Sequence, residues 1–481
     1  MKLRHYVLYL TASVLFAIAL DISMLDDGLR HIAFAVHQDS MHSWGEVFPH
    51  SLFGSYDPWH LWHSLLGQLS HIVSYRYIQI YVNTFILFIL MILVHMYLRK
   101  VVSYSFGSMI YVVVFVIVAV FGGRYWMMRP DALSGLYVFA VLLLPNRILP
   151  ALVLALLYGP FYYLFFLYMG SVGLVFMVQQ KWRAFIGTSL GAIAVGMYFL
   201  FSDFDEYIET LFYVLTDQSL REGLVVTEGE PLFSLFSLLD YTVAVPLFLG
   251  MASLQIYKRY SYFKKHTLVL FLVITAVLWI NQIRYFALFL PFMVVCFLSF
   301  WIEMNFIEFL ENTKKKWGVF KQDIKRIRFI IDPLTVIYML VVTTLMLTTF
   351  SYTETVERKK YFKESFFMHK TILMNSMNLD LYSALYHNPT MHIVPSCGIG
   401  WFDDADEKMK DIYIRMQKKK GITEEEISKL LRYVDADIYI HYIKREGARL
   451  RFAKLKELGI IPLEIYDNHI VFSVEKETNH E

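Results

Sequence analysis

Apolar runs long enough to cross a bilayer recur along most of this chain, and they constrain its fold more than any other feature. A hydrocarbon core about 30 Å thick needs about 20 helical residues at 1.5 Å each. Candidate runs lie at residues 5–23, 78–98, 104–121, 132–144, 148–160, 163–178, 184–202, 241–257, 267–283, 285–306 and 330–350. They predict a polytopic α-helical membrane protein with about eleven transmembrane helices. The runs at 132–144 and 148–160 are short, which indicates tilted or partial helices.

Composition agrees with lipid as the solvent of most of the chain. Of its 481 residues, 57% are hydrophobic and 18% are charged, whereas soluble domains average about 45–50% and about 25%. A net charge of +2 gives no concentrated basic face, so we expect no nucleic-acid partner. The two cysteines, Cys296 and Cys397, do not form a disulfide framework.

The first apolar run has two interpretations. A basic start, an apolar stretch and the small residues of Ala17-Ile18-Ala19 are typical of a cleaved signal peptide. The many later runs favour an uncleaved first transmembrane helix, and this is the interpretation that we adopt.

The distribution of Lys and Arg predicts the orientation, because positively charged loops stay in the cytoplasm. With a cytoplasmic N-terminus, the cytoplasmic loops include 98–100, 181–183, 258–266 and 314–328, the last with seven Lys and Arg. Residues 203–240, on the other side, carry nine Asp and Glu against a single Arg. An odd number of spans then places the C-terminal tail outside.

The chain divides into two predicted domains. Residues 1–350 form the transmembrane domain, with a large first outer loop at 24–77, and residues 351–481 form a small soluble α/β domain on the extracytoplasmic side. In this tail, Thr423-x-x-Glu426 is a capping box that opens a helix, and residues 438–440 are typical of a strand. Residues 449–458 predict a helix, and 460–466 and 469–474 predict a hairpin.

Three carboxylates lie at the end of the first run or just after it: Asp21, Asp26 and Asp27. A carboxylate at the membrane face is costly, which makes it a candidate functional group. It could act as a general base toward a hydroxyl, or a pair could hold a divalent cation through oxygen ligands. The structural alternative is an N-cap for a helix over residues 28–36.

Histidines are frequent in the same loop, and Asp57, His60 and His63 are weaker candidates for substrate binding. His60 and His63 share one helical face and could form a metal pair, although such a site needs further ligands. The alternative is an interfacial helix that begins in the aromatic segment 56–63.

Some arginines lie in predicted outer loops, although Lys and Arg otherwise mark the cytoplasmic loops. Arg124 and Arg129 lie near Asp131, and Arg284 precedes a late apolar run. A guanidinium group donates two parallel hydrogen bonds to phosphate, so these residues suggest capture of a lipid-linked phosphate. Contact with lipid headgroups is the alternative.

Glu228 and Glu230 end the acidic outer loop and are weak candidates for substrate binding. The sequence contains no Walker, Rossmann or nucleophile-elbow motif, so nothing indicates an ATP-driven pump or a nucleotide-sugar site.

Together these motifs resemble the membrane glycosyltransferases of the C-type fold, which take sugars from polyprenyl-phosphate carriers. The resemblance rests on four segments in the order of that family, and it covers nearly the whole chain. They are Leu25-Asp26-Asp27-Gly28, Tyr56-Asp57-Pro58, Arg129-Pro130-Asp131 and the segment 284–291 that starts with Arg284.

The resemblance implies that Asp26 or Asp27 activates the acceptor, with Asp131 as a second acidic contributor. It implies that Arg284 binds the carrier phosphate and that Arg124 and Arg129 assist. The acidic segment with Asp26 and Asp27 contains no Asp-x-Asp motif, so the metal is undefined, and Mg²⁺ or Mn²⁺ is the divalent cation to consider. The expected partners are a polyprenyl-phosphate-linked sugar, membrane lipids, and a glycan, lipid or protein acceptor.

Two other functions fit the same residues. One is a transporter or flippase of lipid-linked saccharides, although no inverted repeat is evident. The other is a non-catalytic membrane assembly protein of the cell envelope, whose loop carboxylates cap helices. Short cytoplasmic loops and the lack of a luminal retention signal favour a bacterial plasma membrane with a periplasmic C-terminal domain.

Overall fold

The computed structural model describes ten continuous stretches and a few isolated positions. The stretches are residues 3–23, 56–73, 75–101, 109–121, 128–216, 360–375, 406–417, 422–442, 452–466 and 469–476; the isolated positions are 31–32, 34–35, 48, 125, 384, 387–388 and 390–394. The four predicted runs between 241 and 350 lie outside these residues.

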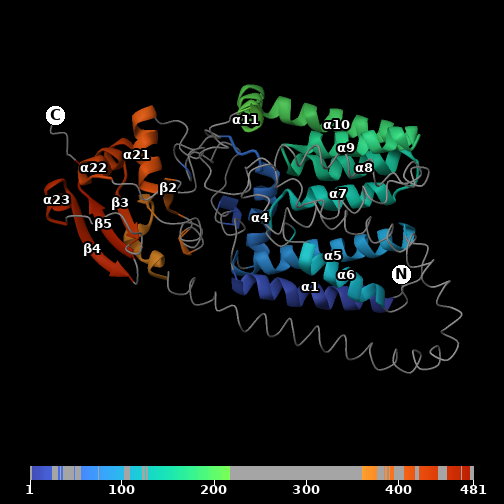
Figure 1. Ribbon diagram of the computed structural model, residues 1–481, viewed down its shortest axis with the longest axis horizontal. Coiled ribbons are helices and arrows are strands. Elements are labelled where there is room, and N and C mark those ends of the chain that lie inside the picture. The colour runs from blue at the N-terminus through green and yellow to red at the C-terminus, as the bar shows by residue number, and fades with distance from the viewer. Residues whose placement is uncertain are drawn as a thin grey trace, which may run out of the picture. The chain divides into compact units, whose positions relative to one another are not determined.

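A helix lies at each of the first seven predicted apolar runs (Figure 1). These helices are α1 (Leu3–Ser23), α5 (Tyr75–Val101), α6 (Met109–Phe121), α7 (Ala132–Leu143), α8 (Ile148–Tyr158), α9 (Phe165–Val178) and α10 (Trp182–Ser202). A single turn of 3-10 helix, η2 (Gly159–Phe161), follows α8. The chain also forms α4 (His60–Ile72) and α11 (Phe204–Thr216).

Two of the described helices are long and apolar enough to span a membrane, namely Tyr77–Lys100 within α5 and α10. Shorter apolar helices cover His5–Ile18, Ala132–Leu143, Ile148–Phe161 and Phe165–Met177. The total of about eleven spans stays a prediction.

Helix α10 has one close-packed face and one open apolar face. A Cβ atom on Gly187 would lie 2.3 Å from the carbonyl oxygen of Ile148, and one on Gly191 would lie 2.3 Å from the Cβ of Ala155. Small residues four apart therefore let α8 and α10 approach closely, as in membrane helix pairs.

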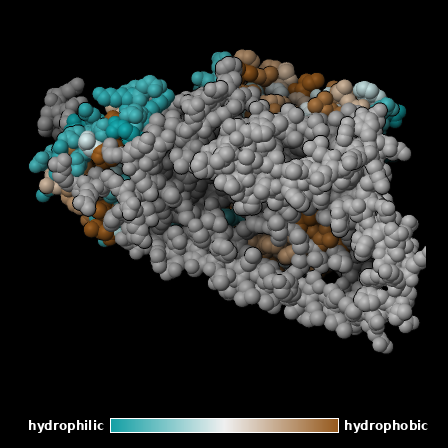
Figure 2. All heavy atoms as spheres, in the orientation of Figure 1, coloured by the Kyte–Doolittle hydropathy of each residue, from teal (hydrophilic) through white to brown (hydrophobic). Residues whose placement is uncertain are grey.

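The opposite face of α10 carries large apolar side chains with exposed surface. They recur every three or four residues: Trp182, Ile186, Leu190, Ile193, Met197 and Phe201. Figure 2 shows this hydrophobic surface along α10, in contrast to the hydrophilic surface over the C-terminal helices. A continuous apolar stripe of this length on an exposed face is suited to lipid rather than water.

The C-terminal segment forms a five-stranded mixed sheet of order β2-β1-β3-β5-β4. Its strands are β1 (Thr371–Met374), β2 (His392–Val394), β3 (Ile438–Tyr442), β4 (Ile460–Tyr466) and β5 (His469–Val474). β1 pairs in parallel with β2 and β3, whereas β5 runs antiparallel to β3 and β4. The hairpin predicted over 460–474 and the strand predicted at 438–440 are confirmed.

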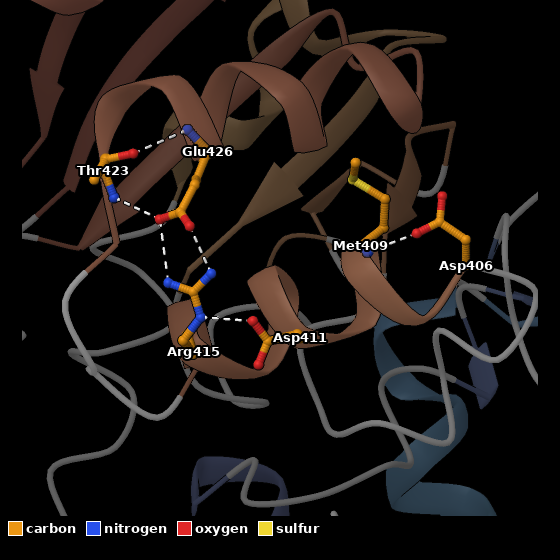
Figure 3. A network of polar contacts seen from close by, with 6 residues as sticks. All are labelled: Asp406, Met409, Asp411, Arg415, Thr423 and Glu426. Atoms are coloured by element: carbon orange, nitrogen blue, oxygen red, sulfur yellow. Dashed lines mark hydrogen bonds and ion pairs between the residues drawn. The ribbon is translucent and has the colours of Figure 1, made fainter.

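Helices α21 (Glu407–Gln417), α22 (Glu424–Tyr433) and α23 (Phe452–Glu457) contribute to one core with this sheet. Two short 3-10 helices, η6 (Lys360–Lys363) and η7 (Ser365–Phe367), precede β1. The predicted capping box is confirmed, because Thr423 accepts from the backbone of Glu426 while the Glu426 side chain accepts from the backbone of Thr423. Figure 3 shows that Arg415 of α21 reaches the same carboxylate.

The described residues group into two compact units. Those of 1–23 and 79–198 form one unit, and those of 24–78, 199–229 and 352–481 form the other. The predicted division at residue 350 stays a prediction.

Candidate functional site

Three buried side chains of residues 31–63 form a continuous hydrogen-bonded chain. The Nδ1 atom of His63 lies 2.6 Å from Oδ2 of Asp57, and its Nε2 atom lies 2.6 Å from Nδ1 of His31. The other carboxylate oxygen, Oδ1 of Asp57, accepts a hydrogen bond from the backbone N–H of Trp59 at 2.9 Å. We call this arrangement the Asp57–His63–His31 chain.

The start of α4 explains how Asp57 and His63 meet. The backbone N–H of His60 donates to the carbonyl oxygen of Asp57, and that of His63 donates to the carbonyl oxygen of Trp59. This turn begins the helix and places the imidazole of His63 over the carboxylate six residues earlier. The N-terminal end of a helix, where the first backbone N–H groups have no partner within the helix, also favours a negative charge nearby.

The Asp57–His63–His31 chain is buried among aromatic residues. The side chains of Asp57 and His63 have no exposed surface, and His31 is 2% exposed. The ring centroid of Phe34 lies 4.5 Å from that of His63, and the ring of Trp59 lies edge-on to His31 at 5.6 Å. In such surroundings, hydrogen bonds are stronger than in water and a lost partner costs more.

The backbone near His31 also packs tightly against α4. A Cβ atom on Gly67 would lie 2.9 Å from the carbonyl oxygen of Ala35. The described positions His31, Ile32, Phe34 and Ala35 have helical backbone. Helical backbone here is compatible with the alternative in which Asp26 and Asp27 cap a helix.

Asp131 occupies a second buried position, at the start of α7. Asp131 is 9% exposed. The backbone N–H of Ala132 donates to the carbonyl oxygen of Arg129, and that of Ser134 donates to the carbonyl oxygen of Asp131. The Arg129 side chain is partly buried. Thus the segment Arg129-Pro130-Asp131 enters the helix as a tight turn.

A buried tyrosine fixes the chain just before this turn. The hydroxyl of Tyr125 lies 1.7 Å from where a Cβ atom on Gly135 would stand, so only glycine leaves room for it. Tyr158 shares a 2.7 Å hydrogen bond with Ser134.

Several of the residues predicted for the site fall outside the described part of the chain. They are the acidic pair Asp26 and Asp27, the arginines Arg124 and Arg284, and the glutamates Glu228 and Glu230. Among the others, Asp57 and His63 are brought into contact. His60 is partly exposed on α4.

Within the described residues, no group of three or more His, Cys, Asp or Glu side chains is arranged to hold a metal ion. The close partners of the buried His63 are Asp57 and His31. A divalent cation at Asp26 and Asp27 stays a prediction.

Within the Asp57–His63–His31 chain, His31 is the residue that the sequence did not predict as part of the site. It stands 32 residues from His63, and no periodicity links two such positions. The one local signal was the spacing of Asp57 and His63 around the start of a helix, which predicts contact between those two only.

Comparison with known proteins gives a structural likeness without a sequence relative. No family model matches the chain, and no curated protein matches its sequence. Its structure is similar to the archaeal oligosaccharyltransferase AglB from Archaeoglobus fulgidus, solved in complex with an inhibitory peptide and a dolichol-phosphate. The TM-score is 0.53 at 11% identity, over 92% of this chain and 70% of that chain.

This likeness concerns the fold. AglB is a glycosyltransferase of the C-type fold, which is the fold class that the sequence motifs resembled. Together with the apolar helices, the shared fold indicates a membrane protein.

Proposed function

We propose that this chain is an integral membrane glycosyltransferase that moves a sugar from a polyprenyl-phosphate carrier to an acceptor on the extracytoplasmic face. The observation that carries the proposal is the fold shared with an oligosaccharyltransferase over 92% of the chain. Because one fold can host several functions, the proposal also needs support from the site itself.

The order of sequence motifs along this fold is the second support. The acidic segment with Asp26 and Asp27 follows α1 directly, and Asp131 stands at the start of α7. These carboxylates are the proposed catalytic groups. Asp57 belongs to the same predicted outer loop as the acidic segment and makes a buried contact with His63.

The dolichol-phosphate bound to AglB supports the proposed class of donor, because dolichol-phosphate is a polyprenyl-type lipid phosphate. In this chain Arg284 is the proposed phosphate ligand, assisted by Arg129 and Arg124. Guanidinium groups stabilise the negative charge that develops on a departing phosphate. Glu228, Glu230 and His60 are weaker candidates for contact with the sugar or acceptor.

The proposed reaction is a displacement at the anomeric carbon. A hydroxyl or amide group of the acceptor forms a bond to that carbon and gives its proton to Asp26 or Asp27. The bond from the carbon to the phosphate oxygen breaks, and its electron pair leaves with the polyprenyl phosphate. Carboxylate oxygens suit Mg²⁺ or Mn²⁺, so the acidic residues fit such a cation by their chemistry.

The acceptor class and the cell compartment are further parts of the proposal. AglB was solved with a peptide, which supports testing peptide as well as glycan and lipid acceptors. The charge distribution of the loops supports a cytoplasmic N-terminus and a periplasmic C-terminal domain in a bacterial plasma membrane.

The experiment is transfer from a mixture of radiolabelled polyprenyl-phosphate sugars to membrane acceptors by the purified protein. We expect label in the acceptors with wild type and its loss in the double variant Asp26→Asn, Asp27→Asn. Asp205→Asn is the matched control, because Asp205 is an exposed carboxylate on α11 outside the proposed site.

Other outcomes would redirect the proposal. Movement of labelled lipid across vesicle membranes without transfer would identify a flippase. Neither movement nor transfer by folded protein would favour an assembly protein. Full activity in the double variant would refute the catalytic assignment of the two carboxylates.

A further inference from the structure

Five cationic side chains lie at one end of the apolar helices in the unit that contains residues 79–198. They come from three short segments of the sequence: Arg99, Lys100, Arg147, Lys181 and Arg183. Their side chains are exposed or half-buried, at the end of α5 and at the starts of α8 and α10. We call these five residues the cation cluster.

Lys100 connects the end of α5 to the end of α7. Its Nζ atom donates to the carbonyl oxygen of Leu142 at 2.8 Å and to that of Leu143 at 3.5 Å. The last carbonyl groups of a helix have no partner within it, and an ammonium group has three N–H donors. Lys100 therefore closes the end of α7 and can still donate to one further acceptor.

The charge of Lys181 lies near that of Lys100. Burial and the positive charge of Lys100 lower the pKa of the Lys181 amino group. The Nζ atom of Lys181 also lies 5.8 Å from the centre of the Phe176 ring, near the end of α9. Because the two ammonium groups repel each other, an anion beside them stabilises the charged form of both.

A second contact joins the starts of α8 and α10. The Oδ1 atom of Asn146 accepts a hydrogen bond from the backbone N–H of Ala184 at 3.0 Å. Arg147 directly follows Asn146, and Arg183 directly precedes Ala184. The hydrogen bond therefore brings the segments of the two arginines together.

Helices α8 and α10 run in parallel from this contact. A Cβ atom on Gly187 would lie 2.3 Å from the carbonyl oxygen of Ile148, and one on Gly191 would lie 3.6 Å from that of Leu152. The second contact follows the first by four residues in both helices, so both helices start at the same end. Because a helix start carries a partial positive charge, the two starts add to the positive potential of the cation cluster.

The described part of this unit has no carboxylate beside the cation cluster. Asp131 is the only Asp or Glu between residues 58 and 202. It precedes Leu142 by eleven residues, which places it about 16 Å away along α7. Among the described residues, none of the five cations forms an ion pair. We therefore expect an external anion to balance their charge.

The surface next to the cation cluster is apolar. Trp182 and Ile186 of α10 and Leu149 and Val153 of α8 all have exposed side chains. Figure 2 shows hydrophilic surface where the hydrophobic surface along α10 stops. Exposed Trp is typical of the depth at which lipid headgroups lie. An anion with acyl chains can contact both surfaces at once, whereas a free anion contacts the cations alone.

We propose that the cation cluster binds the phosphate headgroup of an anionic phospholipid, whose acyl chains lie against α8 and α10. Lys and Arg near a membrane surface attract anionic lipids, and basic sites between membrane helices bind their headgroups. This inference goes beyond the proposed sugar transfer and needs only the membrane location of the chain. With the predicted cytoplasmic N-terminus, the lipid belongs to the cytoplasmic leaflet.

The test is a lipid titration of the purified full-length protein in detergent, followed by native mass spectrometry. The probes are phosphatidylglycerol and phosphatidylcholine with identical acyl chains. The triple variant Arg147→Gln, Lys181→Gln, Arg183→Gln removes three charges from the cation cluster. The matched control is Lys408→Gln, Lys429→Gln, Lys456→Gln, which removes three exposed charges from the C-terminal segment.

We expect wild type to bind phosphatidylglycerol more tightly than phosphatidylcholine. The triple variant should bind phosphatidylglycerol about a hundredfold more weakly, since each cation near an anionic surface contributes about fivefold. The control variant should bind it as wild type does. High salt should weaken the binding by screening, and inorganic phosphate at the same concentration should not displace the lipid.

Three results would overturn the proposal. They are equal binding of both lipids by folded wild type, unchanged binding in the folded triple variant, and displacement of the lipid by inorganic phosphate, which would identify a site for free anions. If thermal unfolding shows that the triple variant does not fold, Lys181→Gln alone decides, with an expected loss of about fivefold. Sugar transfer is measured separately, so its absence overturns the proposed function and leaves the lipid site standing.

Discussion

The Nδ1 atom of His63 lies 2.6 Å from Oδ2 of Asp57, and neither side chain has exposed surface. Sequence placed both residues among the weak candidates for substrate binding. In the structure each is the close partner of the other, and His31 continues the contact at 2.6 Å. Because both side chains are buried, their hydrogen bond contributes to the stability of this loop.

Truncation of this contact should destabilise the loop. Asp57→Ala removes the acceptor of a buried N–H group, which typically costs about 1–3 kcal/mol. His63→Ala should cost a similar amount, and the double variant should cost clearly less than the sum because both changes remove one interaction. Chemical unfolding in detergent, followed by Trp fluorescence, measures these differences; fully additive losses would show that the two side chains do not interact.

Gly135 should tolerate no side chain. Gly135→Ala places a Cβ atom 1.7 Å from the Tyr125 hydroxyl and 2.5 Å from its ring, so Tyr125 must move and disturb the turn that carries Asp131. We expect a loss of about 1–3 kcal/mol, as for an overpacked core, and reduced transfer. Gly170→Ala is the control, because nothing lies within 4 Å of its Cβ.

In that control, alanine should stabilise helix α9 by about 0.5–1 kcal/mol through its helix propensity. Thermal unfolding of both variants is the measurement. Equal behaviour of the two variants would contradict the close contact of Tyr125 with Gly135.

Asp131→Asn should reduce transfer without unfolding the protein. Asp131 is the predicted second acidic contributor, and it is buried at the start of α7. Asparagine has the same size, so loss of the charge should lower kcat by at least about tenfold if the carboxylate takes part in proton transfer or charge stabilisation. The measurement is kcat and thermal unfolding together; unchanged kcat in folded protein would remove Asp131 from the site.

The C-terminal helices should lose protection in acid. Arg415 donates two hydrogen bonds to Glu426, at 2.6 and 3.2 Å, and these lower the pKa of the Glu426 carboxyl (Figure 3). A lowered pKa in the folded state contributes stability above the carboxyl pKa of the unfolded chain, near 4.3. That stability is lost as the pH falls through the folded pKa.

Hydrogen exchange over residues 407–433 of the full-length protein measures this effect. Wild type should lose about 1 kcal/mol of protection in acid. Glu426→Gln should show that loss already at neutral pH and little further change in acid. Glu407→Gln is the control, since the side chain of Glu407 is 96% exposed; a similar effect there would contradict a specific role of Glu426.

Local patterns predicted much of the secondary structure. Each of the first seven apolar runs is a helix, because a run of apolar residues with a helical length can satisfy its backbone only in that way in lipid. The capping box at Thr423 and the hairpin at 460–474 depend on residues a few positions apart. Their outcome is therefore set by short-range hydrogen bonds that the sequence alone displays.

Tertiary structure decided the contacts between distant residues. The hydrogen bond between His31 and His63 joins residues 32 positions apart, and the parallel pairing of β1 with β3 joins strands that are separated in the sequence by α21 and α22. The place of Tyr125 against Gly135 is a matter of shape complementarity between two buried groups. The sequence determines which groups can form hydrogen bonds. Packing decides which of these groups are buried next to one another, and groups buried away from water must bond to each other.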